Sequence, residues 1–506
     1  MRTSGVLMPI FSLASKYGIG TLGKEAYNFV DFLKEAGQTY WQILPVGTTS
    51  FGDSPYQSFS AYAGNPYFID LEELCKMGLL TTSQIEAFEW GEDVGSIDYE
   101  IMYNSRYKVL RLAFENFKKN IPEQYEKFVT ENSYWLEDYA LFSALKDYHK
   151  GASFDKWEVG YKKREPVYMQ KAREELGDDI SFYKMLQYLF DLQWEKLKKY
   201  ANENGIYIIG DIPIYVAFDS ADVWSDPMQF VLDEELIPTA VAGCPPDAFS
   251  EDGQLWGNPL YDWDYMKKHD YDWWIRRVDY ATKLYDMVRI DHFRGFSAFF
   301  SIPYGDKTAV GGKWVKGPGK ALFEEINKKL GKLNIIAEDL GTIDDDVREL
   351  LKFTGYPGMK VLQFAFDPDS ESSYLPHNII QNCVVYTGTH DNDTAIGFMN
   401  DADEKAVEFM REYLRIGSSD SFNWSLIKAA MATSAETVIL QMQDFLGLDN
   451  TARINKPSTI GENWKWRIGP GCVNSWLAKI IYDCTKTYFR LPPQKEKTTK
   501  NDGKNA

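Results

Sequence analysis

Short apolar segments recur along the chain, and most of them are followed by polar or glycine-rich turns. Short apolar runs bounded by turn residues are typical of strands in a parallel sheet, because helices cover both faces of such a sheet. The pattern predicts strands at eight places, which are 5–8, 41–45, 206–210, 287–290, 335–337, 360–364, 384–387 and 438–442.

Amphipathic helical segments lie between several of these strands. Segment 24–36 has apolar residues at helical spacing and is followed by Gly37, a residue that commonly ends helices, and 181–202 shows the same spacing. About eight strands that alternate with helices predict a (β/α)8 TIM barrel of the α/β class. A doubly wound open sheet is the structural alternative, because counting strands does not show whether the sheet closes.

The distances between the predicted strands are uneven, which indicates large insertions in the βα loops. One insertion covers approximately residues 47–180 and is mostly helical, and a second covers approximately 215–280 and is loop-rich. We expect a single catalytic barrel domain over 1–490 that includes both insertions. Segment 491–506 is polar and lacks aromatic residues, so we expect a disordered tail.

The composition of the chain disfavours several classes of partner and location. The formal net charge of −19 disfavours nucleic acid and anionic membranes as partners, because both attract clustered Lys and Arg. No uninterrupted apolar run approaches the length of a membrane span. The five cysteines are widely spaced and form no Cys-x-x-Cys motif, which fits a reducing cytoplasm. A neutral or cationic substrate is compatible with this composition.

Acidic residues follow four of the predicted strands, namely Asp211, Asp291, Glu338 and Asp391. The carboxyl ends of barrel strands open on one face, so these side chains are expected to converge there. Converging carboxylates repel one another, which raises the pKa of one of them and leaves an acid beside an anion. Retaining cleavage of a glycosidic bond requires that pair. A single Asp after a strand is more often a helix cap, so the prediction depends on finding four together.

Two further features surround these carboxylates. Arg289 lies two residues before Asp291 and therefore shares its strand face, where it can keep the carboxylate ionised. His292 and His390 each neighbour one of the acidic residues. A metal site is the competing interpretation of clustered Asp, Glu and His. The sequence contains no His-Glu-x-x-His or EF-hand motif, and we expect no metal, although spacing alone leaves an oxygen-only Mg²⁺ or Ca²⁺ site open.

Three of these strand ends resemble the signatures of amylomaltase, the 4-α-glucanotransferase family also called disproportionating enzyme. They are the runs RIDHFRG at 289–295, AEDLG at 337–341 and TGTHDNDT at 387–394. Further similar runs occur in the same order over most of the chain, at 52–60, 64–67, 210–215, 245–250, 253–260, 355–364 and 461–464. The fold of that family is the same eight-fold barrel with insertions.

The resemblance implies transfer of an α-1,4-glucan segment from a donor to the 4-hydroxyl of an acceptor glucan or glucose. It implies that Asp291 is the nucleophile, that Glu338 is the general acid and then the base, and that Asp391 grips hydroxyls of the distorted sugar. The expected intermediate is a covalent glucosyl-Asp ester, and no cofactor is expected. The resemblance also implies a set of substrate-binding residues: Arg289, His390, Asp211, Tyr56, Ser54, Asp339, Trp256, Asp247, Phe249, Gln254 and Asn463.

Some alternatives stay open at this point. An α-amylase-type hydrolase has the same carboxylates, and a non-catalytic glycan-binding protein can have the same fold. Ser297 and Phe300 replace an acidic residue and a Trp that are common in the family, which puts acceptor or chain-length preference in doubt. Tyr56 and Trp256 are also compatible with ordinary packing. Loop 245–257 is a candidate cover over the site, and oligomeric state is undetermined.

Overall fold

The central element of the molecule is an eight-stranded parallel sheet. The computed structural model describes residues 2–50, 52–246 and 251–493. The strands pair in the order β10-β11-β12-β1-β2-β3-β6-β9, and all the pairings are parallel. Their bounds are β1 (Thr3–Leu7), β2 (Tyr40–Gln42), β3 (Tyr207–Ile212), β6 (Met287–Ile290), β9 (Ile335–Ala337), β10 (Gly358–Val361), β11 (Cys383–Tyr386) and β12 (Thr437–Gln441).

The sheet curls into a nearly closed barrel whose seam lies between β9 and β10. The Ala337 N–H donates to the Pro357 carbonyl at 2.9 Å, and the Met359 N–H donates to the Asp339 carboxylate at 2.6 Å. An added Cβ on Gly358 would lie 2.6 Å from that carboxylate, so the close approach requires glycine. A strand lies at each of the eight predicted places, although the one predicted at 360–364 is β10 at Gly358–Val361 and a 3-10 helix follows it at Leu362–Phe364. The barrel is therefore confirmed, and the open doubly wound sheet is excluded.

Helices pack around the barrel because each buries one apolar face against the strands. In α1, the buried residues Ala26, Phe29, Val30 and Leu33 form that face, and Gly37 follows the helix with a positive φ of 65°. The helices that alternate with the strands are α1 (Lys24–Glu35), α9 (Gly177–Glu203), α12 (Asp272–Leu284), α13 (Lys320–Leu330), α14 (Asp345–Thr354), α17 (Phe422–Ala432) and α19 (Ser475–Thr487).

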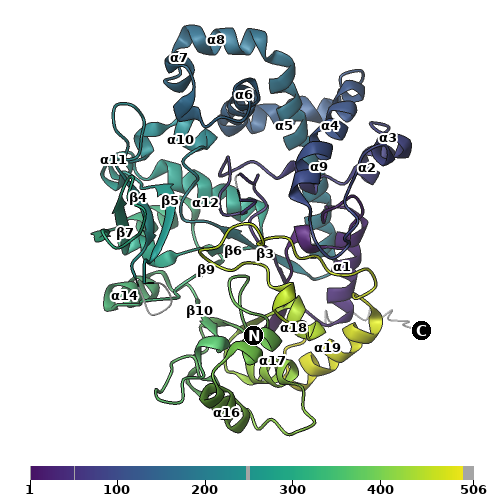
Figure 1. The fold of residues 1–506 in the computed structure, drawn as a ribbon, viewed down its shortest axis with the longest axis vertical. Coiled ribbons are helices and arrows are strands. Elements are labelled where there is room, and N and C mark those ends of the chain that lie inside the picture. Colours follow the sequence, from purple (N-terminus) through teal and green to yellow (C-terminus); the bar gives the residue numbers. More distant parts are fainter. Residues whose placement is uncertain (1, 51, 247–250, 494–506) are drawn as a thin grey trace, which may run out of the picture.

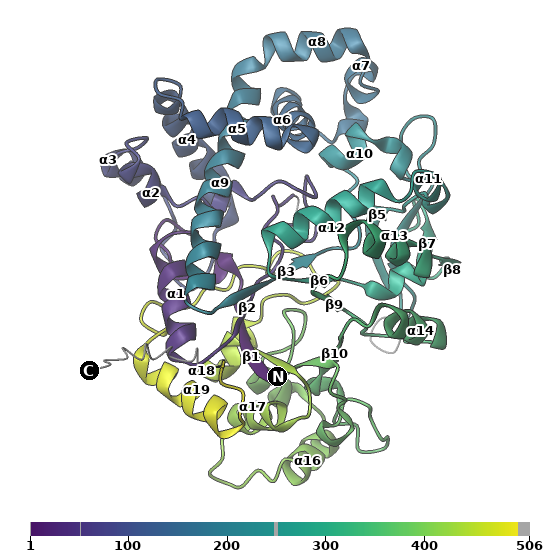
Figure 2. The same ribbon diagram turned by 180° about the vertical axis from the view of Figure 1, so that it is seen from behind.

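The long connection between β2 and β3 forms a helical layer. Figures 1 and 2 show this layer around the amino-terminal part of α9, above the barrel strands. Its members are α2 (Leu71–Lys76), α3 (Thr82–Glu86), α4 (Tyr99–Phe117), α5 (Glu123–Glu131), α6 (Ser133–Tyr148), α7 (Val159–Lys162) and α8 (Pro166–Glu175). Shorter helices elsewhere are α10 (Ala221–Ser225), α11 (Trp263–Lys268), α15 (Ala395–Asp401), α16 (Glu404–Tyr413) and α18 (Met442–Leu446).

A second, antiparallel sheet stands beside the barrel and was not predicted from the sequence. Its strands pair in the order β5-β4-β7-β8. They are β4 (Ala240–Cys244), β5 (Gln254–Pro259), β7 (Ala298–Pro303) and β8 (Lys313–Lys316). The segment expected to be loop-rich thus contains two strands, and Figure 1 shows the sheet next to α12.

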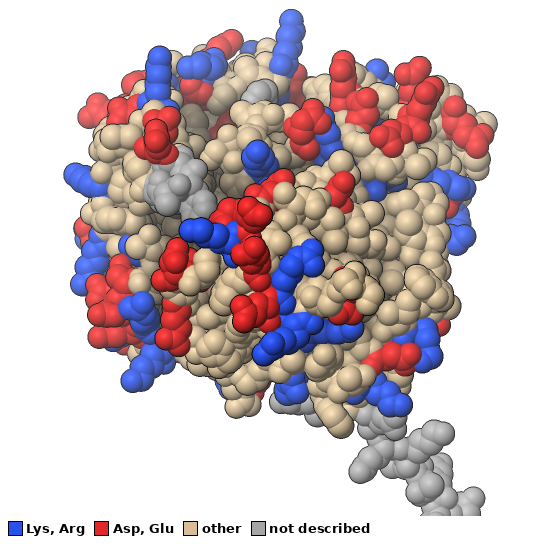
Figure 3. All heavy atoms as spheres, turned by 60° about the horizontal axis from the view of Figure 1, so that its bottom comes forward, with Lys and Arg blue, Asp and Glu red and all other residues tan. Residues whose placement is uncertain are grey.

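The surface carries both signs of charge. On the face drawn in Figure 3, acidic and basic side chains are interspersed, with broad uncharged areas between them. Within the described residues, no helix is both long enough and apolar enough to cross a membrane.

Candidate active site

Three neighbouring strands bring three of the four predicted carboxylates together at the barrel mouth. Asp211 pairs with Arg289 in the register of β3 and β6. Hydrogen bonds continue beyond the strand ends, from the Asp291 N–H to the Ile212 carbonyl and from the Glu338 N–H to the Ile290 carbonyl, each at 3.0 Å. Asp291 and Glu338 therefore stand side by side at the carboxyl ends of β6 and β9, where barrel enzymes bind their substrates.

Arg289 connects two of these carboxylates. Its Nη1 donates to Asp211 Oδ2 at 2.5 Å and its Nη2 donates to Asp291 Oδ1 at 3.0 Å. The Asp211 side chain has no exposed area, whereas 27% of the Asp291 side chain is exposed. The guanidinium thus orients Asp291 with a charge-assisted hydrogen bond and leaves this carboxylate accessible from the mouth.

Glu338 has a different environment. Its Oε2 accepts from the His292 N–H at 2.7 Å and its Oε1 accepts from the Leu340 N–H at 2.8 Å. Burial raises the pKa of Glu338 to about 8, the charge of Arg289 opposes that rise, and the charge of Asp291 adds to it. Glu338 is consequently protonated at neutral pH, and an acid stands next to the accessible Asp291 carboxylate.

Asp211 lies deeper than the other two. Burial raises the pKa of Asp211 to about 7, against the opposing charge of Arg289. Its Oδ2 accepts from the Tyr56 hydroxyl at 2.8 Å as well as from Arg289. Asp211 therefore anchors both Arg289 and the aromatic ring of Tyr56 at the base of the site.

An aromatic wall lines one side of the mouth. The rings of Tyr56 and His390 stack with centroids 5.1 Å apart and an interplanar angle of 13°. The Trp464 ring lies 5.8 Å from Tyr56 and 6.0 Å from His390. Burial lowers the pKa of His390, so its imidazole is neutral at physiological pH. Tyr56 and His390 thus lie together beside the barrel mouth.

Asp391 follows β11 and lies beside this wall. Its Oδ1 accepts from Asn455 Nδ2 at 2.6 Å and lies 3.3 Å from His390 Nε2. Its backbone carbonyl accepts from Arg453 Nη2 at 2.6 Å. The side chain is partly exposed, so its second oxygen is available to a ligand.

His292 joins the second sheet to the barrel mouth. It adopts a left-handed conformation with φ of 50°, and its N–H is the donor to Glu338. Its ring lies edge-on to the Trp256 indole, at 4.8 Å between centroids and 89° between planes. Burial lowers the pKa of His292 to about 4, so the ring is neutral. Gln254 Oε1 accepts from Trp256 Nε1 at 3.0 Å and fixes this indole.

Other predicted binding residues make structural contacts. Asp339 binds the Met359 N–H at the barrel seam, and Ser54 Oγ accepts from the Tyr56 N–H at 3.2 Å within a turn. Asn463 makes its hydrogen bonds within its own loop, to Lys456 and Thr459. A binding role for these three stays a prediction. Asp247 and Phe249 lie outside the described residues.

Three residues of the site were not singled out from the sequence. Asn455 and Arg453 hold Asp391, and Trp464 completes the aromatic wall. Trp464 ends the run at 461–464 that supports the family resemblance, and this was the available signal. Asn455 and Arg453 belong to no periodic pattern, so only the folded chain places them.

Among the described residues, no group of three or more His, Cys, Asp and Glu side chains has the arrangement of a metal site. Arg289 forms an ion pair with both Asp211 and Asp291.

Known proteins share both the sequence and this fold. The chain matches the family described as 4-alpha-glucanotransferase over residues 8–471. It is 51% identical to the 4-alpha-glucanotransferase of Clostridium butyricum over 489 residues, which is 96% of this chain and 100% of the relative. The corresponding enzyme of Thermus thermophilus is 46% identical over 481 residues, covering 93% of this chain and 95% of that one.

Solved structures of amylomaltases share the fold of this chain. Amylomaltase from Streptococcus agalactiae, in complex with acarbose, superposes with a TM-score of 0.95 at 42% identity and covers 97% of this chain and 100% of its own. Amylomaltase from Corynebacterium glutamicum shows the same fold, with a TM-score of 0.76 at 20% identity over 97% of this chain and 74% of its own. From residue 8 to residue 471, this chain belongs to the 4-alpha-glucanotransferase family.

Proposed function

We propose that this 4-alpha-glucanotransferase works by retaining double displacement, with Asp291 as the nucleophile and Glu338 as the acid and base. The observation that carries the proposal is the contrast between these neighbours. Arg289 donates a hydrogen bond to the accessible Asp291 carboxylate, and burial raises the pKa of Glu338 to about 8. A nucleophilic anion beside a proton donor is what the first step of a retaining enzyme needs.

In the first step, Glu338 donates its proton to the glycosidic oxygen while an Asp291 oxygen attacks C1 of the donor sugar. The C1–O4 bond breaks, and the departing glucan leaves with a free 4-hydroxyl. In the second step, the 4-hydroxyl of an acceptor attacks C1 of the β-glucosyl ester. The Glu338 carboxylate takes the hydroxyl proton, the ester bond to Asp291 breaks, and the α-linkage is restored.

The surrounding residues bind the sugar at the cleavage point in this proposal. Tyr56, held by Asp211 and stacked on His390, presents an aromatic ring to the apolar C–H face of the sugar. Asp391, held by Asn455, accepts from sugar hydroxyls. Support comes from the Streptococcus agalactiae relative, which was solved with the oligosaccharide acarbose. The donor is therefore an α-1,4-glucan, and the acceptor is a glucan or glucose.

Transfer requires that an acceptor outcompete water for the ester. A bound acceptor gains a large effective concentration, which favours its 4-hydroxyl over water. We assign acceptor contact to the Trp256 indole, because its position against His292 places it beside the N–H donor to Glu338. A cytoplasmic location, expected from the cysteine pattern, stays a prediction.

Trapping the ester tests the assignment of Asp291 and Glu338. Glu338→Gln lacks the base for the second step, so a donor with a good leaving group, such as α-maltosyl fluoride, should glycosylate it and stop. Mass spectrometry of peptides should find the sugar on Asp291. Turnover of maltotriose should fall by a factor on the order of 10² to 10⁴.

Two control variants complete that experiment. Asp291→Asn should lose turnover yet still bind oligosaccharide, and it should form no ester. Asp345→Asn makes the same chemical change at an exposed position on α14 and should leave turnover unchanged. A glycosylated peptide that lacks Asp291, or substantial turnover by Asp291→Asn, would refute the assignment.

A further inference from the structure

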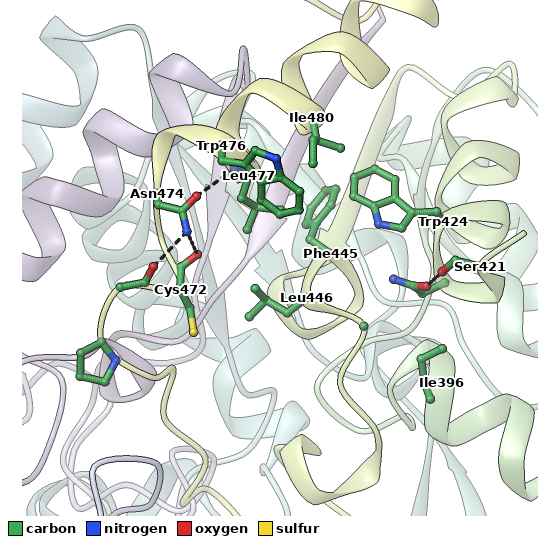
Figure 4. Close-up of a pocket in the computed structure, with 14 residues that line it drawn as sticks. Ile396, Ser421, Trp424, Phe445, Leu446, Cys472, Asn474, Trp476, Leu477 and Ile480 are labelled. Carbon is green, nitrogen blue, oxygen red and sulfur yellow. Dashed lines mark hydrogen bonds between the residues drawn. The ribbon is translucent and has the colours of Figure 1, made fainter.

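A hollow of about 700 Å³ lies outside the active site, between the ends of α17, α18 and α19. Figure 4 shows the side chains that line it. Its volume falls within the roughly 300–1,000 Å³ that is usual for sites that bind small ligands. None of the residues of the active site described above lines it, so it requires its own explanation.

The hollow opens on the same end of the barrel as the active site. It is lined by the first residues of α17 and α19 and by the end of α18, which directly follows β12. The opposite end of α19 lies at the amino ends of the strands, where Arg490 donates to the Thr3 carbonyl at 3.0 Å. Ile396, which also lines the hollow, is only five residues after Asp391. A long polymer could therefore touch both places.

Three aromatic side chains line the hollow. Phe445 is buried, and the Trp424 ring lies 5.7 Å from the Phe445 ring. In Figure 4 the Trp476 indole lies on the other side of Phe445 from Trp424. Trp476 is 73% exposed although it is among the largest apolar side chains of the protein. The exposed Trp476 indole and the half-buried Trp424 indole, on either side of the buried Phe445 ring, indicate a surface that binds a partner with apolar faces.

The charge of the lining restricts that partner. Every residue that lines the hollow is described, and none is Asp, Glu, Lys, Arg or His, although 25% of the chain is charged. Of the polar lining residues, Ser421 and Asn474 are exposed, whereas Asn423 is buried and its Nδ2 donates to the Asp444 carbonyl. Asn474 is fixed by its bonds to the Leu477 N–H and the Gly471 carbonyl. This surface offers no charge to bind a phosphate, a nucleotide or an ionic peptide, whereas a neutral sugar has the apolar faces and the hydroxyls that suit it.

We propose that this hollow is a second glucan-binding site, which holds a neutral stretch of a long α-1,4-glucan while another part of the same chain occupies the active site. The proposal rests on the function proposed above for its choice of glucan. The two tryptophans stack on successive sugar rings, and the rim amides and hydroxyls contact sugar hydroxyls. Short substrates such as maltotriose use the active site alone.

Affinity electrophoresis tests the proposal. Asp291→Asn protein, which leaves the glucan intact, is run in native gels containing soluble amylose, with and without Trp424→Ala and Trp476→Ala. The double tryptophan change should weaken retardation by amylose about tenfold, as expected when two stacking contacts are lost. Phe489→Ala is the matched control, because Phe489 is an 87% exposed aromatic near the opposite end of α19.

Activity measurements on short and long substrates distinguish a failure of the second site from a failure of the proposed catalytic function. With Asp291 intact, the Trp424→Ala/Trp476→Ala protein should disproportionate maltotriose like the wild type and should have a higher KM for amylose. Equal retardation of all variants by amylose would overturn the second site. A loss of maltotriose activity in a protein with unchanged Tm would also overturn it, because the hollow would then belong to the active site. The proposal would also be overturned if the wild type ran as a dimer in size-exclusion chromatography and the two tryptophan changes dissociated it. The hollow would then be covered by a second copy of this chain and not by a glucan.

Discussion

Three acidic residues within one barrel mouth have different surroundings. Asp211 is fully buried against Arg289, Asp291 shares that guanidinium but remains accessible, and Glu338 is buried with only backbone N–H donors. Burial without a directly paired cation favours the neutral form of a carboxyl group, whereas a guanidinium contact favours the anion. The division of roles between Asp291 and Glu338 follows from this difference.

The ionisation of Glu338 predicts how activity and stability depend on pH. The pKa of Glu338 is about 8 in the folded protein, against an ordinary value of 4.5. A raised pKa contributes stability that is complete below pH 4.5 and is lost as pH rises through about 8. We expect kcat/KM for maltotriose to fall above pH 8. On account of Glu338, we also expect the free energy of unfolding to fall by about 4 kcal/mol between pH 5 and pH 9, measured by urea denaturation.

Two variants identify the group responsible. Glu338→Gln cannot ionise, so most of the loss of stability between pH 5 and pH 9 should disappear in it. Asp211 also titrates in this range, with a pKa of about 7. Asp211→Asn should therefore lose its own share of the fall in unfolding free energy and keep the share that Glu338 contributes. If Glu338→Gln retained the full pH dependence of the wild type, the protonated state of Glu338 at neutral pH would be contradicted.

Site residues at the ends of strands could be predicted from the sequence, whereas those in irregular segments could not. The convergence of Asp211, Asp291, Glu338 and Asp391 could be predicted because each follows the apolar run of a strand, and strand ends meet in a barrel. Asn455 lies in an irregular segment, where no periodicity shows what it faces. Its contact with Asp391 depends on a path of the chain that only the folded structure determines.

At the scale of elements, the barrel strands were predictable and the second sheet was not. The barrel strands are buried on both faces and read as continuous apolar runs, as in β11 and β12. In contrast, β4 contains Gly243 and ends at Cys244, and β5 contains Gly257 and ends at Pro259, so neither strand is a continuous apolar run. An added Cβ on Gly243 would lie 2.1 Å from the Gln254 carbonyl oxygen, so glycine marks a close approach of strands here and not a loop.

Asp339 provides a prediction about the barrel seam. Its carboxylate is buried and accepts the Met359 N–H, which joins β9 to β10. Asp339→Ala leaves that donor unpaired, so the free energy of unfolding should fall by about 1–3 kcal/mol, measured by chemical denaturation. Asp339→Asn keeps an acceptor oxygen and should retain most of the stability. A large rise in KM for maltotriose in Asp339→Asn, with stability unchanged, would instead indicate the substrate-binding role expected from the resemblance.

At the scale of the whole molecule, the site is assembled from segments far apart in the sequence. Tyr56 comes from the long connection between β2 and β3, Trp256 from the second sheet, and Trp464 from the segment before α19. In Figure 1 that last segment, drawn in yellow, crosses the barrel near β3 and β6. The Ile97 N–H donates to the Lys465 carbonyl at 2.9 Å, which ties the segment to the helical layer. The insertions thus build the walls of the site around carboxylates that the barrel supplies.

The product distribution from maltotriose tests the central claim most directly. Purified protein is incubated with maltotriose, EDTA and no added metal, the products are separated by size, and reducing ends are counted over time. A transferase that uses Asp291 and Glu338 should release glucose and build a ladder of longer glucans while the number of reducing ends stays nearly constant, because each cleavage is matched by a new linkage. Reducing ends that climb steadily, with no product longer than maltotriose, would show a hydrolase and contradict the account.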